Sequence, residues 1–171
     1  MEGVIGTIIG AILTLVITEI KRFHGKVNIN TLDYKISYII RNSDGMGGFI
    51  YDETENIEEA NMFKYRIPIV FYNNSEVLKN LYSIKLKFIG STGEEYIHTP
   101  FDKATKKVVG PCKNFDRVGI VNLEPHKLVA IDLFGDILSD EWVKFKELGG
   151  IKSIYVIGLN HKHKNYKMKI V

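Results

Sequence analysis

Residues 65–88, YRIPIVFYNNSEVLKNLYSIKLKF, hold two segments in which apolar side chains recur at every second position. This alternation is the pattern of a β-strand with one buried face. Residues 65–72 and 81–88 are therefore predicted to be strands, and the turn-forming sequence Asn73-Asn74-Ser75 ends the first of them. The predicted inward side chains are Tyr65, Ile67, Ile69, Phe71, Tyr82, Ile84, Leu86 and Phe88.

Pro68 lies within the first of these strands and has no N–H group to donate to a neighbouring strand. Proline is tolerated in sheets mainly on edge strands and at bulges. The strand over residues 65–72 is therefore predicted to lie at a sheet edge or to carry a bulge.

The remaining chain predicts more strands and one short helix. A strand pair is expected around Glu124-Pro125-His126 and a closing hairpin across residues 160–164. Ser139 is expected to cap a helix over residues 140–148, which carries acidic residues in its first turn and glycines after its end. The other predicted strands are residues 33–41, 94–98, 117–123, 127–134, 151–159 and 165–171.

About seven to nine strands with turns between them, and no alternation of strands with helices, predict an antiparallel immunoglobulin-like β-sandwich. The Cys…Trp…Cys arrangement of true immunoglobulin domains is absent, because Cys112 is the only cysteine. No intrachain disulfide is possible, and the thiol is expected to be free and inert. With 171 residues and 45% hydrophobic composition, the chain is long enough for one packed domain with an appendage.

The appendage is residues 4–20, VIGTIIGAILTLVITEI, which carry no charge before Glu19. A stretch of roughly 17 residues, about 25 Å long as a helix, is at the short end of what crosses a bilayer. We expect a transmembrane anchor over residues 1–22 and a β-sandwich domain over residues 23–171. A cleaved signal peptide and a helix buried in an oligomer are the alternatives, although the charges of a signal peptide stand at the other end.

The charges around this segment predict its orientation. Lys21, Arg22 and Lys26 follow it, and Glu2 precedes it. Positive residues stay on the cytoplasmic side of a membrane. We therefore expect a single-pass protein of the cell membrane, with its N-terminus outside and its C-terminal domain in the cytoplasm.

Glycines in the same segment predict contacts between helices. Gly6 and Gly10 have the G-x-x-x-G spacing, with Gly3 nearby, and small residues let helix backbones approach closely in lipid. Membrane lipid and a second copy of the chain are thus expected partners of the helix, and Gly3, Gly6 and Gly10 are candidate self-association residues. A glycine-tolerant lipid-facing helix is the alternative.

The whole layout resembles a known group of proteins. A short apolar segment ending in Lys-Arg is followed by IPIVFYNNSEVLKNLYSIKLKF at residues 67–88 and by IYVIGLNHKHKNYKMKI at residues 154–170. This arrangement resembles small membrane-anchored β-sandwich proteins of bacteria and their phages. The resemblance implies the fold and says little of activity.

No sequence pattern indicates catalysis or a cofactor. The glycine-rich residues 45–49 lack the lysine of a phosphate-binding loop, and G-x-S-x-G, H-E-x-x-H and C-x-x-C are absent. His161 and His163 would need a third metal ligand such as His98 or His126, and the lysines beside them repel a cation. The acidic residues 52–59 lack the spacing of a calcium loop. We expect no catalytic residue, no metal and no cofactor.

The C-terminal segment HKHKNYKMK is basic. Lys162, Lys164, Lys167 and Lys169 form a candidate surface that faces lipid or another partner. Two other interpretations are a contact with nucleic acid, against which the mild net charge of +3 argues, and a solvated strand face that suppresses aggregation.

These observations predict a membrane-anchored, non-enzymatic binding or scaffolding module at the cytoplasmic membrane face. Its partner would be an unknown protein or small ligand. The alternative is an oligomeric membrane effector of a bacterial defence or stress system, whose β domain senses a ligand and rearranges the transmembrane helices. Threonines in the apolar segment, which would line an assembled helix bundle, favour this alternative.

Overall fold

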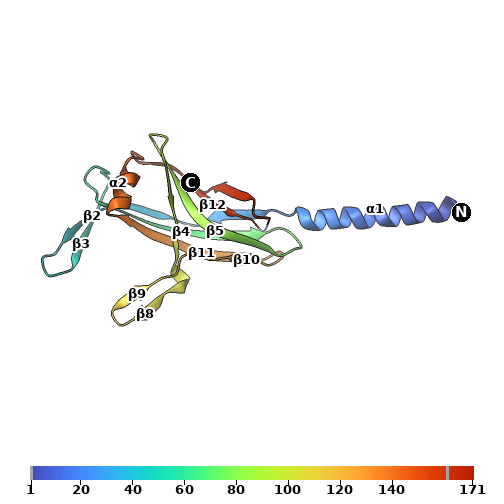
Figure 1. Ribbon diagram of the computed structural model, residues 1–171, viewed down its shortest axis with the longest axis horizontal. Coiled ribbons are helices and arrows are strands. Elements are labelled where there is room, and N and C mark those ends of the chain that lie inside the picture. Colours follow the sequence, from blue (N-terminus) through green and yellow to red (C-terminus); the bar gives the residue numbers. More distant parts are fainter. Residues whose placement is uncertain (1, 161) are drawn as a thin grey trace.

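The computed structural model describes residues 2–160 and 162–171, without the side chains of residues 2–6, 21, 23 and 24. Two antiparallel sheets form a sandwich, and one long helix projects from its end (Figure 1). The first sheet contains β1 (Val27–Thr31), β2 (Lys35–Ser43), β3 (Phe49–Thr54), β4 (Met62–Asn73), β7 (Phe101–Asp102) and β11 (Leu128–Leu138). The second contains β5 (Lys79–Gly90), β6 (Glu95–His98), β10 (Val121–Leu123), β12 (Ile151–Leu159) and β13 (Asn165–Lys169).

Four further elements complete the described chain. They are the helix α1 (Glu2–His24), the short helix α2 (Asp140–Lys146), a 3-10 turn (Lys103–Thr105) and a separate hairpin of β8 (Lys107–Val109) and β9 (Cys112–Asn114). The hairpins β2–β3 and β8–β9 both extend from the sandwich (Figure 1). Cys112 lies on β9 and is free and exposed.

The strand β4 organises the first sheet. It pairs with β11 along its whole length on one side and with β1 and β2 in succession on the other. Its inward side chains Phe63, Ile67 and Phe71 are fully buried. Burying such side chains stabilises the fold by about 1.5–3 kcal/mol each. The predicted strand is confirmed, and it is longer than residues 65–72.

The predicted edge or bulge position of Pro68 is wrong, because β4 is a central strand. Pro68 lies where pairing with β2 ends at Arg66 and pairing with β1 begins at Ile69. The carbonyl of Pro68 accepts a hydrogen bond from the backbone of Leu32, in the bend between β1 and β2. The N–H and the C=O of a residue in an antiparallel strand point to the same side. Because the C=O of Pro68 faces the bend between β1 and β2, the N–H that proline lacks would also face this break between the two partner strands.

Aromatic rings fill the end of the core beneath α2. Phe63 of β4 stacks on Phe145 of α2 at a centroid distance of 4.5 Å, and Phe88 of β5 meets both rings edge-on. Trp142 of α2 is also buried. Such pairs stabilise by about 0.5–1.5 kcal/mol beyond their burial. The predicted helix is confirmed, but Ser139 makes no side-chain capping hydrogen bond.

The closing hairpin β12–β13 forms as predicted, and the predicted strand at residues 94–98 is β6, which pairs with β5. The strand pair predicted around Glu124-Pro125-His126 is wrong: β10 covers only residues 121–123 and pairs with β5, whereas β11 pairs with β4. The expected seven to nine strands become thirteen in the described chain, because β1, β3, β7, β8 and β9 were not predicted. These five strands are short or largely exposed, so no sustained apolar alternation marks them.

The predicted fold class is wrong for the helix α1. Within the described residues, no helix has both the length and the apolar character needed to span a bilayer. Thr7, Gly10, Thr14 and Thr18 dilute its aliphatic residues, and Glu19 ends the uncharged run. The prediction of a transmembrane anchor is therefore wrong. The structure shows a projecting helix and a mainly β domain instead.

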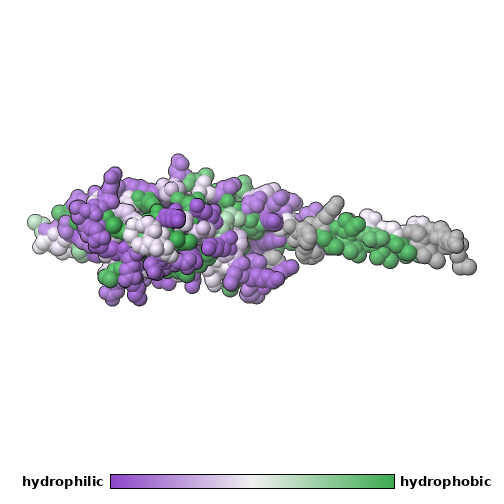
Figure 2. Space-filling model, turned by 90° about the horizontal axis from the view of Figure 1, so that it is seen from above, coloured by the Kyte–Doolittle hydropathy of each residue, from purple (hydrophilic) through white to green (hydrophobic). Residues whose placement is uncertain are grey.

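The described side chains of α1 nevertheless remain uncovered. Every residue from 7 to 20 is exposed, including aliphatic side chains such as Leu15, which is 67% exposed. Figure 2 shows the described side chains of this helix as a mostly green, apolar surface beyond a largely purple domain. The hydroxyls of Thr14 and Thr18 donate to carbonyls one turn earlier, at 2.8 Å each, so they add little polarity.

The side chain of Asn73 joins the two sheets at the end of β4. Its amide nitrogen donates to the carbonyls of Val77 at 2.8 Å, Leu123 at 2.8 Å and Glu124 at 3.1 Å. Its amide oxygen accepts from the hydroxyl of Ser75 at 2.6 Å. Asn73 is fully buried, and these contacts satisfy both ends of its amide.

Replacing Asn73 by alanine is expected to lower the free energy of unfolding by about 2–4 kcal/mol, because several buried polar groups lose their partner at once. Urea denaturation of the full chain measures the change. Asn74→Ala is the matched control, since Asn74 is the exposed neighbour and its side chain makes no such contacts. Equal stability of the two variants would contradict this role.

Candidate functional site

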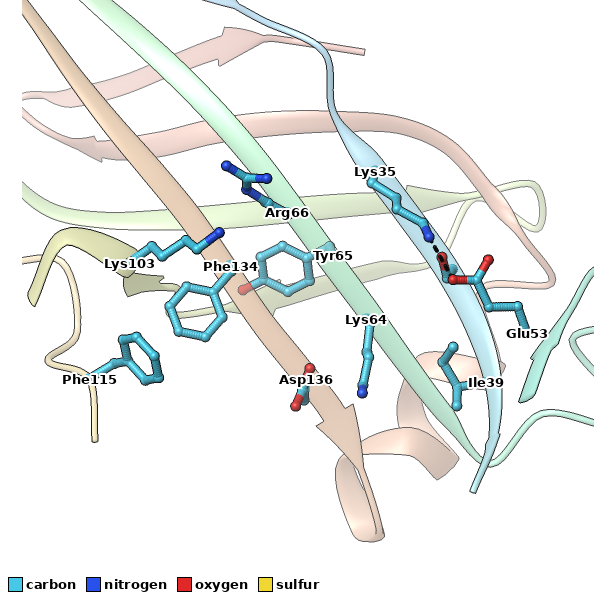
Figure 3. Close-up of a pocket in the computed structure, with 11 residues that line it drawn as sticks. Lys35, Ile39, Glu53, Lys64, Tyr65, Arg66, Lys103, Phe115, Phe134 and Asp136 are labelled. Carbon is cyan, nitrogen blue, oxygen red and sulfur yellow. Dashed lines mark hydrogen bonds and ion pairs between the residues drawn. The ribbon is translucent and has the colours of Figure 1, made fainter. Parts of the chain in front are cut away.

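A groove of about 340 Å³ lies on the outer face of the first sheet. Figure 3 shows its side chains rising from β2, β4 and β11, with Phe115 and Lys103 closing one side. The lining residues are Lys35, Ser37, Ile39, Glu53, Lys64, Tyr65, Arg66, Lys103, Phe115, Phe134 and Asp136.

The register of β4 and β11 sets the floor of the groove. Phe134 stands opposite Arg66, and Asp136 stands opposite Lys64. Because alternate residues of a strand point to opposite faces, these four side chains lie outside while the residues between them enter the core. The same alternation that builds the core thus places two cations, a carboxylate and an aromatic ring side by side on the outside.

Aromatic rings make the floor apolar. Phe115, in the segment after β9, meets Phe134 edge-on at a centroid distance of 4.6 Å. Phe101 of β7 lies on the other side of Phe134, at 5.8 Å. Both Phe115 and Phe134 are only partly buried, so their rings border the groove and remain able to contact a ligand.

Ion pairs occupy some of the charges around the rim. The guanidinium of Arg66 donates two nitrogens to the carboxylate of Asp132, with a shortest distance of 2.7 Å. This bond raises the pKa of Arg66, so the cation stays charged. Lys35 donates to Glu53 at 2.6 Å, and this contact lowers the pKa of that carboxyl.

Lys103 and Lys64 make weaker contacts than Lys35 and Arg66 do. The ammonium of Lys103 lies 3.9 Å from Asp132, whose oxygens already accept from Arg66. The ammonium of Lys64 lies 4.1 Å above the ring of Tyr51 on β3, in a cation–π contact. In the described chain, neither lysine has a carboxylate oxygen within hydrogen-bond distance. Both can therefore receive an anionic group from a ligand.

The carboxyl of Asp136 is the acidic group of the groove that has no protein partner in the described chain. Among the described residues, no donor forms a hydrogen bond or close ion pair with it. Surrounding protein atoms restrict its hydration and raise its pKa, whereas the charges of Lys64, His98 and Arg41 act in the opposite direction without cancelling this effect. Asp136 is exposed, so water still reaches the carboxylate, but no donor of the described chain fixes it and a bound ligand can supply one.

The hydroxyl of Tyr65 passes beneath this region and lies 2.6 Å from Nδ1 of His98. A side chain at Gly135 would collide with that hydroxyl, which explains the glycine between Phe134 and Asp136. Burial is the main cause of the lowered pKa of His98, and nearby Glu141 opposes it. Burial likewise raises the pKa of Tyr65, so both groups are neutral at pH 7.

A family model described as the YopI Ig-like domain matches residues 25–171, which include the whole sandwich and groove. The chain belongs to this family. It is also 28% identical over 168 residues to the SPbeta prophage-derived uncharacterized protein YopI of Bacillus subtilis (strain 168), covering 98% of this chain and 91% of that protein. The predicted immunoglobulin-like fold and link to bacteria and phages are thereby supported, whereas membrane anchoring is not.

Two solved structures are similar to this YopI-family chain only remotely. One is the putative ApaA protein of Bordetella pertussis, with 6% identity, coverage of 86% of this chain and 89% of that chain, and a TM-score of 0.40. The other is an uncharacterized β-sandwich protein of Clostridium difficile 630, with 12% identity, coverage of 85% and 86%, and a TM-score of 0.36. At these scores neither similarity bears on function.

Other candidate residues of this YopI-family chain lie away from the groove. The sites predicted at Gly3 and Gly6 fall outside the residues whose surroundings are described, and Gly10 faces open space. Of the two histidines considered as metal ligands, His161 lies outside the described residues, and the ring of His163 stacks on that of Tyr82 at 5.6 Å. No group of three metal ligands gathers in the described part of the chain.

The structure also places the two charged segments that the sequence singled out. The acidic segment begins on β3 and does not form one long loop: Glu53 pairs with Lys35, and Glu58 pairs with Lys146 at 2.7 Å. The C-terminal lysines are divided between two places, with Lys162 and Lys164 on the turn and Lys167 and Lys169 on β13.

Sequence analysis missed the groove, although β11 carried one signal of it. In residues 128–138, LVAIDLFGDIL, the outward positions hold Asp132, Phe134 and Asp136. An aromatic ring between two carboxylates on a solvent face is unusual, because an outward position needs no large apolar side chain. That pattern predicts a contact surface, but the partner strands that complete the site come from distant segments.

Replacing Asp136 by asparagine is expected to stabilise the full chain slightly at pH 7, because it removes a charge that nearby protein atoms disfavour and that no donor of the described chain stabilises. A raised pKa in the folded state means that this charge destabilises the fold above that pKa and has no effect below the ordinary value of 3.8. The gain from Asp136→Asn should therefore shrink as the pH falls toward 3.8, as urea denaturation across this range measures.

Asp132→Asn is the matched control for that variant. Asp132 lies four residues before Asp136 on the same strand face and undergoes the same chemical change, but its replacement breaks the two-nitrogen bond to Arg66. At pH 7, Asp132→Asn should lower the free energy of unfolding, whereas Asp136→Asn should raise it. If Asp136→Asn destabilises as Asp132→Asn does, Asp136 has a partner and the site is not as described.

Proposed function

We propose that this YopI-family chain is a non-enzymatic binding module whose groove holds an extended segment of a partner protein. The observation that carries the proposal is the carboxyl of Asp136, which faces the groove without a donor. A backbone N–H group of a bound segment would satisfy it, whereas the cations around it disfavour a positively charged ligand. No hydrogen bond or ion pair of the described residues uses this carboxylate, so it is free to take part in binding.

The rest of the groove specifies which segment fits. Phe134 and Phe115 offer an apolar surface, which suits an aromatic or aliphatic side chain. Lys103 and Lys64 offer cations beside that surface, which suit a carboxylate. The expected ligand is therefore an extended segment with an acidic side chain next to an apolar one. The hairpins β2–β3 and β8–β9 project from the sandwich beside this sheet (Figure 1).

The alternative function, an oligomeric membrane effector that rearranges transmembrane helices, has lost its basis. It required a spanning helix, and none is found in the described residues. A binding module requires only the sandwich and its groove, whose side chains come from residues that the structure describes.

A random peptide library displayed on phage, selected against the full chain, tests the groove. The selected peptides should be enriched in acidic residues next to aromatic or aliphatic ones. Lys103→Glu should weaken their binding by roughly ten-fold or more, because it reverses a charge at the groove. Phe134→Ala should weaken it as well, provided that circular dichroism shows the variant to be folded.

Lys113→Glu is the matched control, since Lys113 is an exposed lysine of β9 that does not line the groove. This variant should bind the selected peptides as the unchanged chain does. The proposal fails if no peptide sequence is enriched, or if the Lys103→Glu and Lys113→Glu variants bind equally.

A further inference from the structure

The second sheet carries a basic outer face that is separate from the groove. On the central strand β12, Tyr155 and Ile157 point outward. On one side of them, Lys87 and Lys85 of β5 stand opposite these two residues. On the other side, the opposing residues are Lys169 and Lys167 of β13. Cross-strand neighbours share a face, so four lysines surround one tyrosine and one isoleucine; we name Lys85, Lys87, Lys167 and Lys169 the lysine face.

Little negative charge balances these lysines. Lys87 forms an ion pair with Glu95 of β6, and the ammonium of Lys167 lies 4.2 Å above the ring of Tyr155. Lys85 and Lys169 are exposed and have no ion-pair partner in the described chain. The lysines of β5 and those of β13 flank β12 on its two sides, and their excess of positive charge is suited to a large anionic partner.

The basic surface extends toward α1. Lys162 and Lys164 occupy the turn of the β12–β13 hairpin, and this turn reaches the base of the helix, because Asn160 and Gly25 line one shared pocket. The ammonium of Lys79 donates to the carbonyl of Gly25 at 2.6 Å, which ties the sandwich to the chain just after α1. In Figure 1 the red β12–β13 hairpin lies at the end of the sandwich from which α1 projects.

The side chains of this surface favour a lipid surface over nucleic acid as its partner. Its cations are all lysines, which act as point charges, whereas the arginines that grip phosphates with two bonds are absent from it. The lysine face is a sheet surface, where no groove follows a strand of nucleic acid. Two groups of exposed apolar side chains accompany this surface and would gain from hydrocarbon: Ile97 of β6, which stands opposite Lys87, and the aliphatic side chains of α1, beyond the turn of the β12–β13 hairpin.

We propose that the lysine face docks on an anionic lipid surface, with the uncovered aliphatic side chains of α1 entering the boundary of the acyl chains from one side. The helix does not cross the bilayer in this arrangement. Charge and apolar contact act together, because either one alone gives weak and reversible association. This surface is separate from the groove, so the two proposals stand or fall independently.

Flotation of the full chain with vesicles tests the docking. One set of vesicles contains phosphatidylcholine alone, and the other is an equimolar mixture of phosphatidylcholine and phosphatidylglycerol. The double variant Lys85→Glu and Lys169→Glu should bind the mixed vesicles at least ten-fold more weakly than the unchanged chain. Added salt should weaken the binding of the unchanged chain, because it screens exposed charges.

The matched control is the double variant Lys106→Glu and Lys113→Glu, which changes the net charge equally on the side of the molecule that carries the β8–β9 hairpin. It should bind the mixed vesicles as the unchanged chain does. A Lys85→Gln and Lys169→Gln variant, which removes the charges without reversing them, should show an intermediate loss if the fold is intact.

Three outcomes overturn the proposal. The first is absence of binding to the mixed vesicles. The second is equal binding to both kinds of vesicle, which would assign the contact to α1 alone. The third is equal loss in the two glutamate double variants, which would mean that net charge and not the lysine face is responsible. Salt-sensitive binding of a DNA duplex by a chain that ignores the vesicles would favour nucleic acid instead.

Discussion

The strict alternation of β4 is the constraint on which the rest of the structure depends. Its inward residues, among them Phe63, Ile67 and Phe71, are fully buried, and a shift of its register by one residue would turn all of them to solvent. The same alternation holds Lys64 and Arg66 outside, opposite Asp136 and Phe134 of β11. The core and the groove are therefore two faces of one strand pairing.

The sequence predicted the parts of this arrangement that depend on long apolar alternation. The strands β4, β5, β11, β12 and β13 and the short helix α2 were found because their buried side chains recur at regular spacing. The sequence did not predict which strands pair. The segments around Pro125 looked like a hairpin, yet β10 and β11 join different sheets, because each buries its apolar face against a strand that is distant in sequence.

The functional surfaces were harder to predict for the same reason. Lys167 and Lys169 were noticed as part of a basic segment, but Lys85 and Lys87 join them only through pairing with β12. The groove combines residues from β2, β4, β11 and the segment after β9. The apolar residues at the N-terminus were interpreted as a membrane span, although threonine and glycine dilute them; composition alone did not settle that distinction.

The central claim is that the carboxylate of Asp136 has no donor within the described chain and receives one from a ligand. Carbon-13 NMR of the aspartate carboxyl groups, followed through a pH titration of the full chain and assigned with Asp136→Asn, measures its pKa directly. The account predicts a pKa above the ordinary value of 3.8 for Asp136. A pKa at or below that value would mean that the folded chain already satisfies the carboxylate, and the groove would lose the feature that marks it as a binding site.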